Sequence, residues 1–254
     1  MHYNTMKRPF SINIILLLFI FILQNSCTTK APQVLYSNYS ISKTILKDSN
    51  SIKLIEPYKT QLGKSLKEVI GFSANGLFTR KGESAIGNYM ADAIKTMAEK
   101  RFNTKVTAAF INSGGIRSYL PKGEITVEQI FDIMPFDNLI ILQEVNGKTL
   151  LDFLNHAAEK GGWPVSKGLT YSIKEGKLLT AEIDGNPIDE NAIYTIVNSD
   201  YVVNGGDNTK MLNKIPKKNI NYLVRDAIID YTKWLTQTGK TIDTKIENRI
   251  KDVK

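Results

Sequence analysis

The sequence has 254 residues, of which 42% are hydrophobic and 23% charged; these are ordinary values for a globular protein and exclude a low-complexity chain. The net charge is +8, but the lysines are scattered, so a dedicated nucleic-acid groove is not expected. The charge fits either an anionic partner or a solubilising lysine-rich surface, and the single cysteine, Cys27, excludes an internal disulfide.

The N-terminus has the pattern of an export signal. Lys7 and Arg8 precede the apolar run "SINIILLLFIFIL", which is shorter than a comfortable membrane span. Ser26 and Cys27 follow this run, and a cysteine at that place resembles the lipidated first residue of a mature bacterial lipoprotein. An ordinary signal peptide with an incidental cysteine is the alternative.

The chain is therefore expected to have three parts. Residues 1–26 would be a signal peptide, 27–49 a lipidated tether and linker, and 50–254 a globular domain. Such a protein would be exported and anchored in a membrane through its lipid, in the periplasm or at the cell surface.

Two helices are expected early in the domain. Ile52, Ile55, Tyr58 and Leu62 recur at helical spacing within residues 51–71, although Pro57 should disturb or restart that helix. A second helix is expected over 83–101, where Ser84 is a suitable N-cap. Its apolar stripe comprises Ile86, Met90, Ile94 and Met97.

Helices and strands interleave irregularly in the rest of the chain. Thr126 and Gln129 have capping-box spacing and should open a short helix. The runs 168–173 and 178–184 flank a turn and predict a hairpin. The remaining expected elements are strands over 105–111, 138–145 and 192–199, helices over 148–160 and 219–239, and a turn over 184–187. This order favours a layered α+β domain over a parallel doubly wound sheet.

The loop "NSGGIR", directly after an expected strand, carries groups suited to an anionic ligand. Gly114 and Gly115 let backbone N–H groups approach a ligand closely. Asn112 offers hydrogen-bond donors and an acceptor, and Arg117 can form two parallel hydrogen bonds with a phosphate. The alternative is a tight turn with a surface arginine.

A second glycine loop, "NSDYVVNGGDNT", also follows an expected strand. It places Tyr201 six positions before Asp207, with Gly205 and Gly206 between them. The ring could stack on a base and the carboxylate could hold a ribose diol; a turn with a helix-capping aspartate is the alternative. Phe136 in "MPFDN" is either a third ligand contact or a core residue.

The order of these segments resembles one family. Those that carry the resemblance are "EPYKTQLGKSLKEVIG", "ESAIGNYMADAI", "NSGGIR", "GEITVEQIFDIMPFDN", "GKTLLDFL", "GLTYSI" and "DYVVNGGDNT". Together they resemble the C-terminal domain of bacterial and animal 5′-nucleotidases, from about residue 50 to the end. The resemblance implies a layered α/β/β/α domain with mixed sheets.

The resemblance also implies roles for individual residues. Phe136 and Tyr201 match two rings that sandwich the nucleobase, with a tyrosine in place of the usual phenylalanine, and Asp207 matches the aspartate that holds the ribose hydroxyls. The other substrate-binding residues implied are Arg80, Asn112, Gly114, Gly115, Arg117, Gly205 and Gly206. "GGDNT" departs from the usual "GGDGY" or "GGDGF", which leaves the shape of the loop after Asp207 open.

The catalytic half of such an enzyme is not expected in this chain. Family members resemble two-domain proteins whose N-terminal metallophosphatase holds two metal ions through histidines, aspartates and an asparagine. The two histidines here are His2, within the signal, and His156, on a helix off its apolar stripe. We therefore expect no catalytic residue, no metal ligand and no cofactor bound by this chain, with divalent metals held only by a partner.

Three functions remain open at this point: two that bind a nucleoside or nucleotide, described next, and a relic of the family with structural use only. The chain could supply substrate recognition to a separate metallophosphatase chain and so complete a 5′-nucleotidase-type phosphohydrolase. Alternatively, it could be a surface lipoprotein that binds nucleosides or nucleotides without chemistry. In both cases the expected ligand is a nucleoside or nucleotide and the expected site is the same.

Overall fold

The computed structural model describes residues 37–38 and 48–253, so the predictions for the signal peptide and Cys27 lie outside the described residues. The chain divides into two units, Met1–Ser49 and Asn50–Lys254. The helices are α2 (Ser49–Leu66), α3 (Ala85–Phe102), α4 (Val127–Ile133), α5 (Gly147–Glu159), α6 (Asp200–Val203), α7 (Lys210–Asn213) and α8 (Val224–Gln237), with 3-10 turns η1 (Ser113–Gly115) and η2 (Gly206–Asn208). The strands are β1 (Val69–Ser73), β2 (Ala108–Ala109), β3 (Gly123–Thr126), β4 (Leu139–Asn146), β5 (Leu169–Lys174), β6 (Lys177–Ile183), β7 (Asn186–Pro187), β8 (Ile193–Ser199), β9 (Lys218–Leu223) and β10 (Ile250–Asp252).

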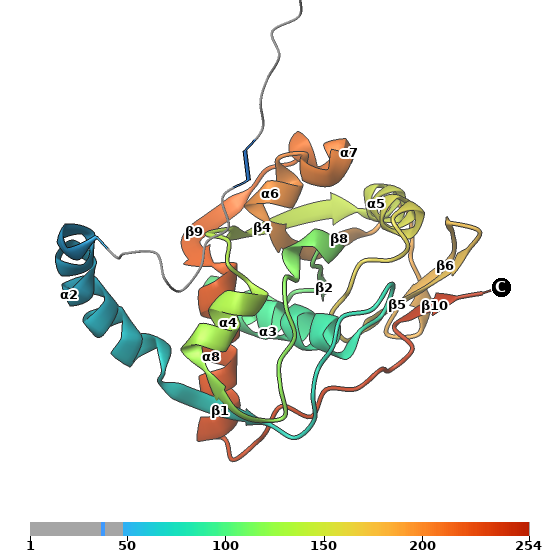
Figure 1. Ribbon diagram of the computed structural model, residues 1–254. Coiled ribbons are helices and arrows are strands. Elements are labelled where there is room, and N and C mark those ends of the chain that lie inside the picture. The colour runs from blue at the N-terminus through green and yellow to red at the C-terminus, as the bar shows by residue number, and fades with distance from the viewer. Residues whose placement is uncertain (1–36, 39–47, 254) are drawn as a thin grey trace, which may run out of the picture. The chain divides into compact units, whose positions relative to one another are not determined.

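The strands form three sheets, two of them mixed (Figure 1). The central sheet has the order β2-β8-β4-β9, in which β2 runs parallel to β8 and the other pairs are antiparallel. A second sheet has the order β10-β5-β6-β7, and β1 pairs with β3. This arrangement confirms the predicted α+β class.

Hydrophobic cores lie on both faces of the central sheet. Residues alternate between the faces along β2 and β8, as the period of a strand requires: Ala109 and Val197 face one core, and Ala108 and Ile196 face the other. The first core is completed by α3, α4 and α8, and the second by α5 and the hairpin β5-β6. The sheet is thus covered on both faces.

Several local predictions are confirmed. The Ser84 side chain accepts a hydrogen bond from the Gly87 N–H at the start of α3. Thr126 and Gln129 form the reciprocal capping box of α4. The β5-β6 hairpin forms as an antiparallel pair, and the apolar stripe of α3 is buried.

Other element predictions are wrong in their bounds. The helix expected over 51–71 ends at Leu66, because Val69–Ser73 pairs with β3 instead. The expected interruption at Pro57 is absent, since α2 runs through that residue. The strand expected over 105–111 contributes only Ala108 and Ala109 to the ladder, followed by a bridge from Phe110 to Val165.

The closing helix also begins later than its hydrophobic period indicates. Residues 218–223 form β9, which pairs with β4, and α8 starts at Val224. Asn221 adopts a left-handed backbone conformation with φ 54°, which a right-handed helix does not contain. Edge pairing with β4 therefore overrides the helical spacing of these residues.

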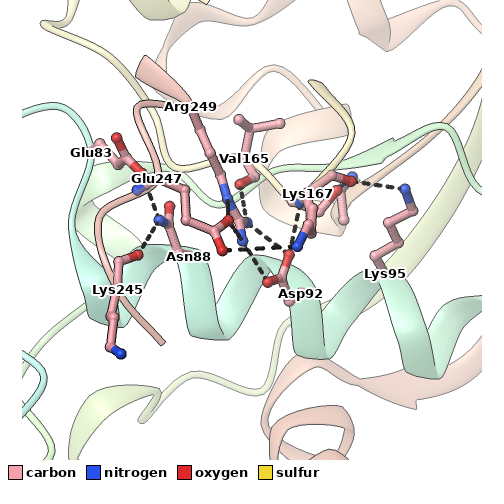
Figure 2. Close-up of polar contacts among 11 residues, drawn as sticks. Glu83, Asn88, Asp92, Lys95, Val165, Lys167, Lys245, Glu247 and Arg249 are labelled. Atoms are coloured by element: carbon pink, nitrogen blue, oxygen red, sulfur yellow. Dashed lines mark hydrogen bonds and ion pairs between the residues drawn. The ribbon is translucent and has the colours of Figure 1, made fainter. Parts of the chain in front are cut away.

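The segment before β10 is fastened to α3 through Arg249, whose side chain is only 4% exposed (Figure 2). Its two terminal nitrogens each lie 2.7 Å from one carboxylate oxygen of Asp92. The guanidinium also donates to Glu247 Oε2, at 2.9 Å from Nε, and to the Val165 carbonyl at 3.0 Å. One buried cation thus joins α3, the loop before β5 and the C-terminal segment.

Candidate functional site

A pocket lies at one edge of the central sheet, where three loops converge. Because β2 and β8 are parallel, their carboxyl ends lie at the same edge, and the antiparallel β4 begins there. The loops after β2, after β8 and before β4 therefore meet. They enclose a cavity of about 270 Å³ that is lined by Asn112, Gly114, Gly115, Phe136, Asn138, Tyr201 and Asp207.

The glycines after β2 make room for Asn112. The Gly115 N–H donates to the Asn112 carbonyl at 2.8 Å and closes the short turn η1. A Cβ on Gly115 would lie 2.9 Å from Asn112 Oδ1, too close for the asparagine to keep its position. The Gly114 carbonyl accepts a hydrogen bond from Arg117 Nη1 at 3.3 Å. The loop thus holds an amide in the pocket and an arginine at its rim.

The second glycine loop folds back on Tyr201. Gly205 has φ 96°, Asp207 has φ 51° and Asn208 has φ 68°, so three residues between α6 and α7 adopt the left-handed conformation. A Cβ on Gly206 would lie 2.6 Å from two carbons of the Tyr201 ring, which shows that glycine is needed for the ring to pack there. Neither Gly205 nor Gly206 is part of the pocket lining.

Asp207 is the meeting point of the two glycine loops. Asn112 Nδ2 donates to its Oδ2 at 2.7 Å, although 95 residues separate the two in sequence. The Tyr201 hydroxyl donates to Oδ1 at 2.9 Å and accepts from the Asp207 N–H at 3.2 Å. Three residues predicted from the sequence are therefore joined in one hydrogen-bond network.

His156 supports this network from α5. Its Nε2 lies 2.8 Å from the Asp207 carbonyl oxygen, which only accepts, so Nε2 carries the proton. The imidazole ring meets Trp163 edge-on, with 5.9 Å between ring centres. His156 thus stabilises the loop that carries Asp207, a role that its position in the sequence did not reveal.

Phe136 lies at the pocket and is 38% exposed, so the core interpretation of this ring is wrong. Its backbone is held by the buried Arg225, whose Nη1 donates to the Phe136 carbonyl at 3.1 Å. Nη2 of the same guanidinium lies 2.5 Å from Asp137 Oδ1. The guanidinium carbon of Arg117 is 5.9 Å from the centre of the Phe136 ring, which places a positive charge beside it.

The two predicted arginines lie outside the pocket lining. Arg117 and Arg80 are both exposed. Arg117 contacts two residues of the pocket lining, the Gly114 carbonyl and the Phe136 ring. Their loops are paired: Leu77 and Leu120 exchange backbone hydrogen bonds of 2.8 and 3.0 Å. The participation of Arg80 in ligand binding stays a prediction.

Besides the role of His156, the sequence did not point to Asn138 or Arg225 as parts of the site. Asn138 lines the pocket, and its closeness to Phe136 in "MPFDN" was the available signal. Arg225 lies at the start of α8, 89 residues from Phe136, and nothing local marks it as a support for that loop. The contact between Arg225 and Phe136 forms because β4 pairs with β9, which places the start of α8 beside the loop before β4.

A wider hollow of about 380 Å³ lies elsewhere, between β9 and α8. Its main polar groups already bind one another, since Asp230 Oδ2 accepts from Arg101 at 3.1 Å and from the Tyr222 hydroxyl at 2.7 Å. Its volume is larger, but the smaller pocket presents exposed aromatic rings next to an amide and a carboxylate. The smaller pocket is therefore the better candidate for a ring-containing ligand.

Within residues 37–38 and 48–253, no group of three or more His, Cys, Asp or Glu side chains is placed to hold a metal ion. In the same ranges, none of the helices has the length and apolar character needed to cross a membrane.

The chain is similar to a known protein family and to several longer proteins. A family model described as the C-terminal domain of 5′-nucleotidase matches residues 69–214. The trifunctional nucleotide phosphoesterase protein YfkN of Bacillus subtilis is 26% identical over 220 residues, covering 78% of this chain and 15% of that protein. The silent protein UshA(0) of Salmonella typhimurium is 26% identical over 193 residues, covering 74% of this chain and 34% of that protein.

Solved structures show the same fold. The 5′-nucleotidase precursor from Thermus thermophilus superimposes with a TM-score of 0.70 at 23% identity, over 80% of this chain and 43% of that one. The NAD nucleotidase of Haemophilus influenzae gives a TM-score of 0.63 at 18% identity, over 81% and 41%. This chain therefore spans less than half the length of these proteins.

Proposed function

This chain belongs to the 5′-nucleotidase C-terminal domain family, and from that membership we propose that it binds a nucleoside or nucleotide in the pocket at the edge of the central sheet. Phe136 and Tyr201 would stack on the nucleobase. Asp207 would accept hydrogen bonds from the ribose hydroxyls, and Asn112 and Arg117 would contact the sugar or phosphate. Arg80 would add a second positive charge for the phosphate.

The observation that carries this proposal is the composition of a single small pocket. Two half-exposed rings, an amide and a carboxylate line the same cavity of about 270 Å³. That volume is close to the lower end of the range for ligand pockets, roughly 300–1,000 Å³, and suits a nucleoside. Arg117 at the rim would meet a phosphate that projects from the cavity.

We propose further that hydrolysis requires a separate metallophosphatase chain. The relatives YfkN and UshA(0) are much longer than the matched region, which covers 15% and 34% of them. The metal-binding residues that two-metal hydrolysis needs would come from the partner. In this arrangement the present chain selects the nucleotide, and the partner cleaves the phosphate.

The purified chain alone is expected to hydrolyse AMP negligibly with Mn²⁺ or Co²⁺ added, while titration calorimetry detects binding of adenosine or AMP. Released phosphate would be measured with and without a candidate metallophosphatase chain. Robust turnover by the chain alone would contradict the proposed division of labour. Binding without any gain in turnover on adding the partner would instead favour the non-catalytic binding lipoprotein.

Membrane anchoring through Cys27 is a further part of the proposal, supported by the signal pattern before it. Lipid chains on Cys27 would hold the exported domain at a membrane, because several acyl chains anchor a protein stably whereas one binds reversibly. Cys27→Ser is expected to move the protein from the membrane fraction to the soluble fraction. Unchanged fractionation of this variant would rule out the lipoprotein assignment.

A further inference from the structure

We propose that the Tyr201 hydroxyl positions Asp207 as a receptor for the cis-diol of ribose, so that this hydroxyl sets the preference for ribonucleosides over 2′-deoxyribonucleosides. The inference rests on the proposed function. It concerns the one atom by which Tyr201 differs from the phenylalanine expected at this place.

Both hydrogen bonds of the Tyr201 hydroxyl are made with Asp207. It donates to Asp207 Oδ1 at 2.9 Å and accepts from the Asp207 N–H at 3.2 Å. Both the side chain and the backbone of the aspartate are therefore held by one oxygen atom. The Tyr201 ring stays 46% exposed and lines the pocket, so its hydroxyl contacts leave the ring accessible to a base.

Two contacts restrain the backbone of Asp207. Its φ of 51° and ψ of 23° lie in the left-handed region, which aspartate and asparagine adopt more often than other non-glycine residues. The following residue, Asn208, also has a positive φ, of 68°. The Tyr201 hydroxyl and the His156 contact to the Asp207 carbonyl, at 2.8 Å, restrain this turn from two sides.

The number of hydrogen bonds already made leaves room for two more. An ionised carboxylate has about four acceptor positions, two on each oxygen. Tyr201 occupies one on Oδ1, and Asn112 occupies one on Oδ2 at 2.7 Å. One position remains on each oxygen, which matches the two neighbouring hydroxyl donors of ribose. A 2′-deoxyribose supplies only one of them.

Without the Tyr201 hydroxyl, Oδ1 loses its fixed donor and the Asp207 N–H loses its acceptor. Asn112 would still hold Oδ2, so the carboxylate would keep one restraint and turn about it. Tyr201→Phe should therefore keep the stacking surface and lose part of the ribose contact. Base stacking and ribose recognition would thus be linked through a single side chain.

The test is a comparison of adenosine with 2′-deoxyadenosine by titration calorimetry on the full chain. The ratio of their dissociation constants is expected to favour adenosine by about tenfold in the wild-type protein, the equivalent of one or two hydrogen bonds. Tyr201→Phe should lower this ratio about threefold or more and leave the affinity for 2′-deoxyadenosine nearly unchanged. Asp207→Asn should also lower the ratio, and the double variant should lower it no further than Asp207→Asn.

The matched control is Tyr222→Phe, because the Tyr222 hydroxyl also donates to an aspartate, Asp230, at 2.7 Å but outside the pocket. This control should leave the ratio unchanged. An unchanged ratio in Tyr201→Phe, or an equal loss for both nucleosides, would overturn the positioning role while leaving the proposed function intact. Failure of the folded wild-type chain to bind any nucleoside would overturn the proposed function and this inference with it.

Discussion

Arg249→Met is expected to lower the free energy of unfolding by about 2–4 kcal/mol. Methionine keeps much of the side-chain volume but removes every hydrogen bond and ion pair of the guanidinium. Asp92 and the Val165 carbonyl would then lose donors at 2.7 and 3.0 Å. The loss should fall short of that for a fully buried pair, because the side chains of Asp92 and Glu247 are 22% and 40% exposed and regain contact with water.

Urea unfolding followed by circular dichroism measures this change. The control is Lys148→Met, which removes a cation from an exposed pair with Asp152 on α5 and should leave the midpoint nearly unchanged. Equal midpoints for Arg249→Met and the wild-type protein would show that the network in Figure 2 adds nothing to stability. Since the C-terminal segment pairs with β5 through β10, we expect its amide hydrogens to exchange faster in the variant.

Phe136→Ala is expected to weaken nucleoside binding by about 1–3 kcal/mol, roughly 5- to 150-fold in the dissociation constant. The ring is 38% exposed at the pocket, so its removal takes away a stacking surface and leaves little cavity in the core. The backbone at this position is held by Arg225 through the Phe136 carbonyl, a contact that alanine retains. The loss should therefore concern the ligand and not the fold.

Calorimetric titration of adenosine and AMP tests this expectation, with urea unfolding to confirm that stability is kept. Phe72→Ala is a suitable control, because Phe72 is an exposed ring on β1 outside the pocket lining. Equal affinities for Phe136→Ala and the wild-type chain would exclude stacking on this ring. A similar loss in Phe72→Ala would show that the effect is not specific to the pocket.

The sequence was informative wherever the deciding contact is local. The cap of α3 joins Ser84 to Gly87, and the capping box of α4 joins Thr126 to Gln129. Each of these motifs closes a hydrogen bond across three residues, so neighbouring side chains suffice to predict it. The candidate ligand-binding residues were indicated by the order of several short motifs, which together resemble a family.

Only the tertiary structure decided how these residues meet. Asn112 binds Asp207 across 95 residues because β2 runs parallel to β8, and His156 reaches the same loop across 51 residues from α5. Likewise, residues 218–223 have helical spacing but form β9, since the backbone of β4 offers them an edge to pair with. Helical period and loop composition depend on near neighbours in the chain. Sheet order, and with it the lining of the pocket, depends on which distant segments compete for the same hydrogen-bond donors and acceptors.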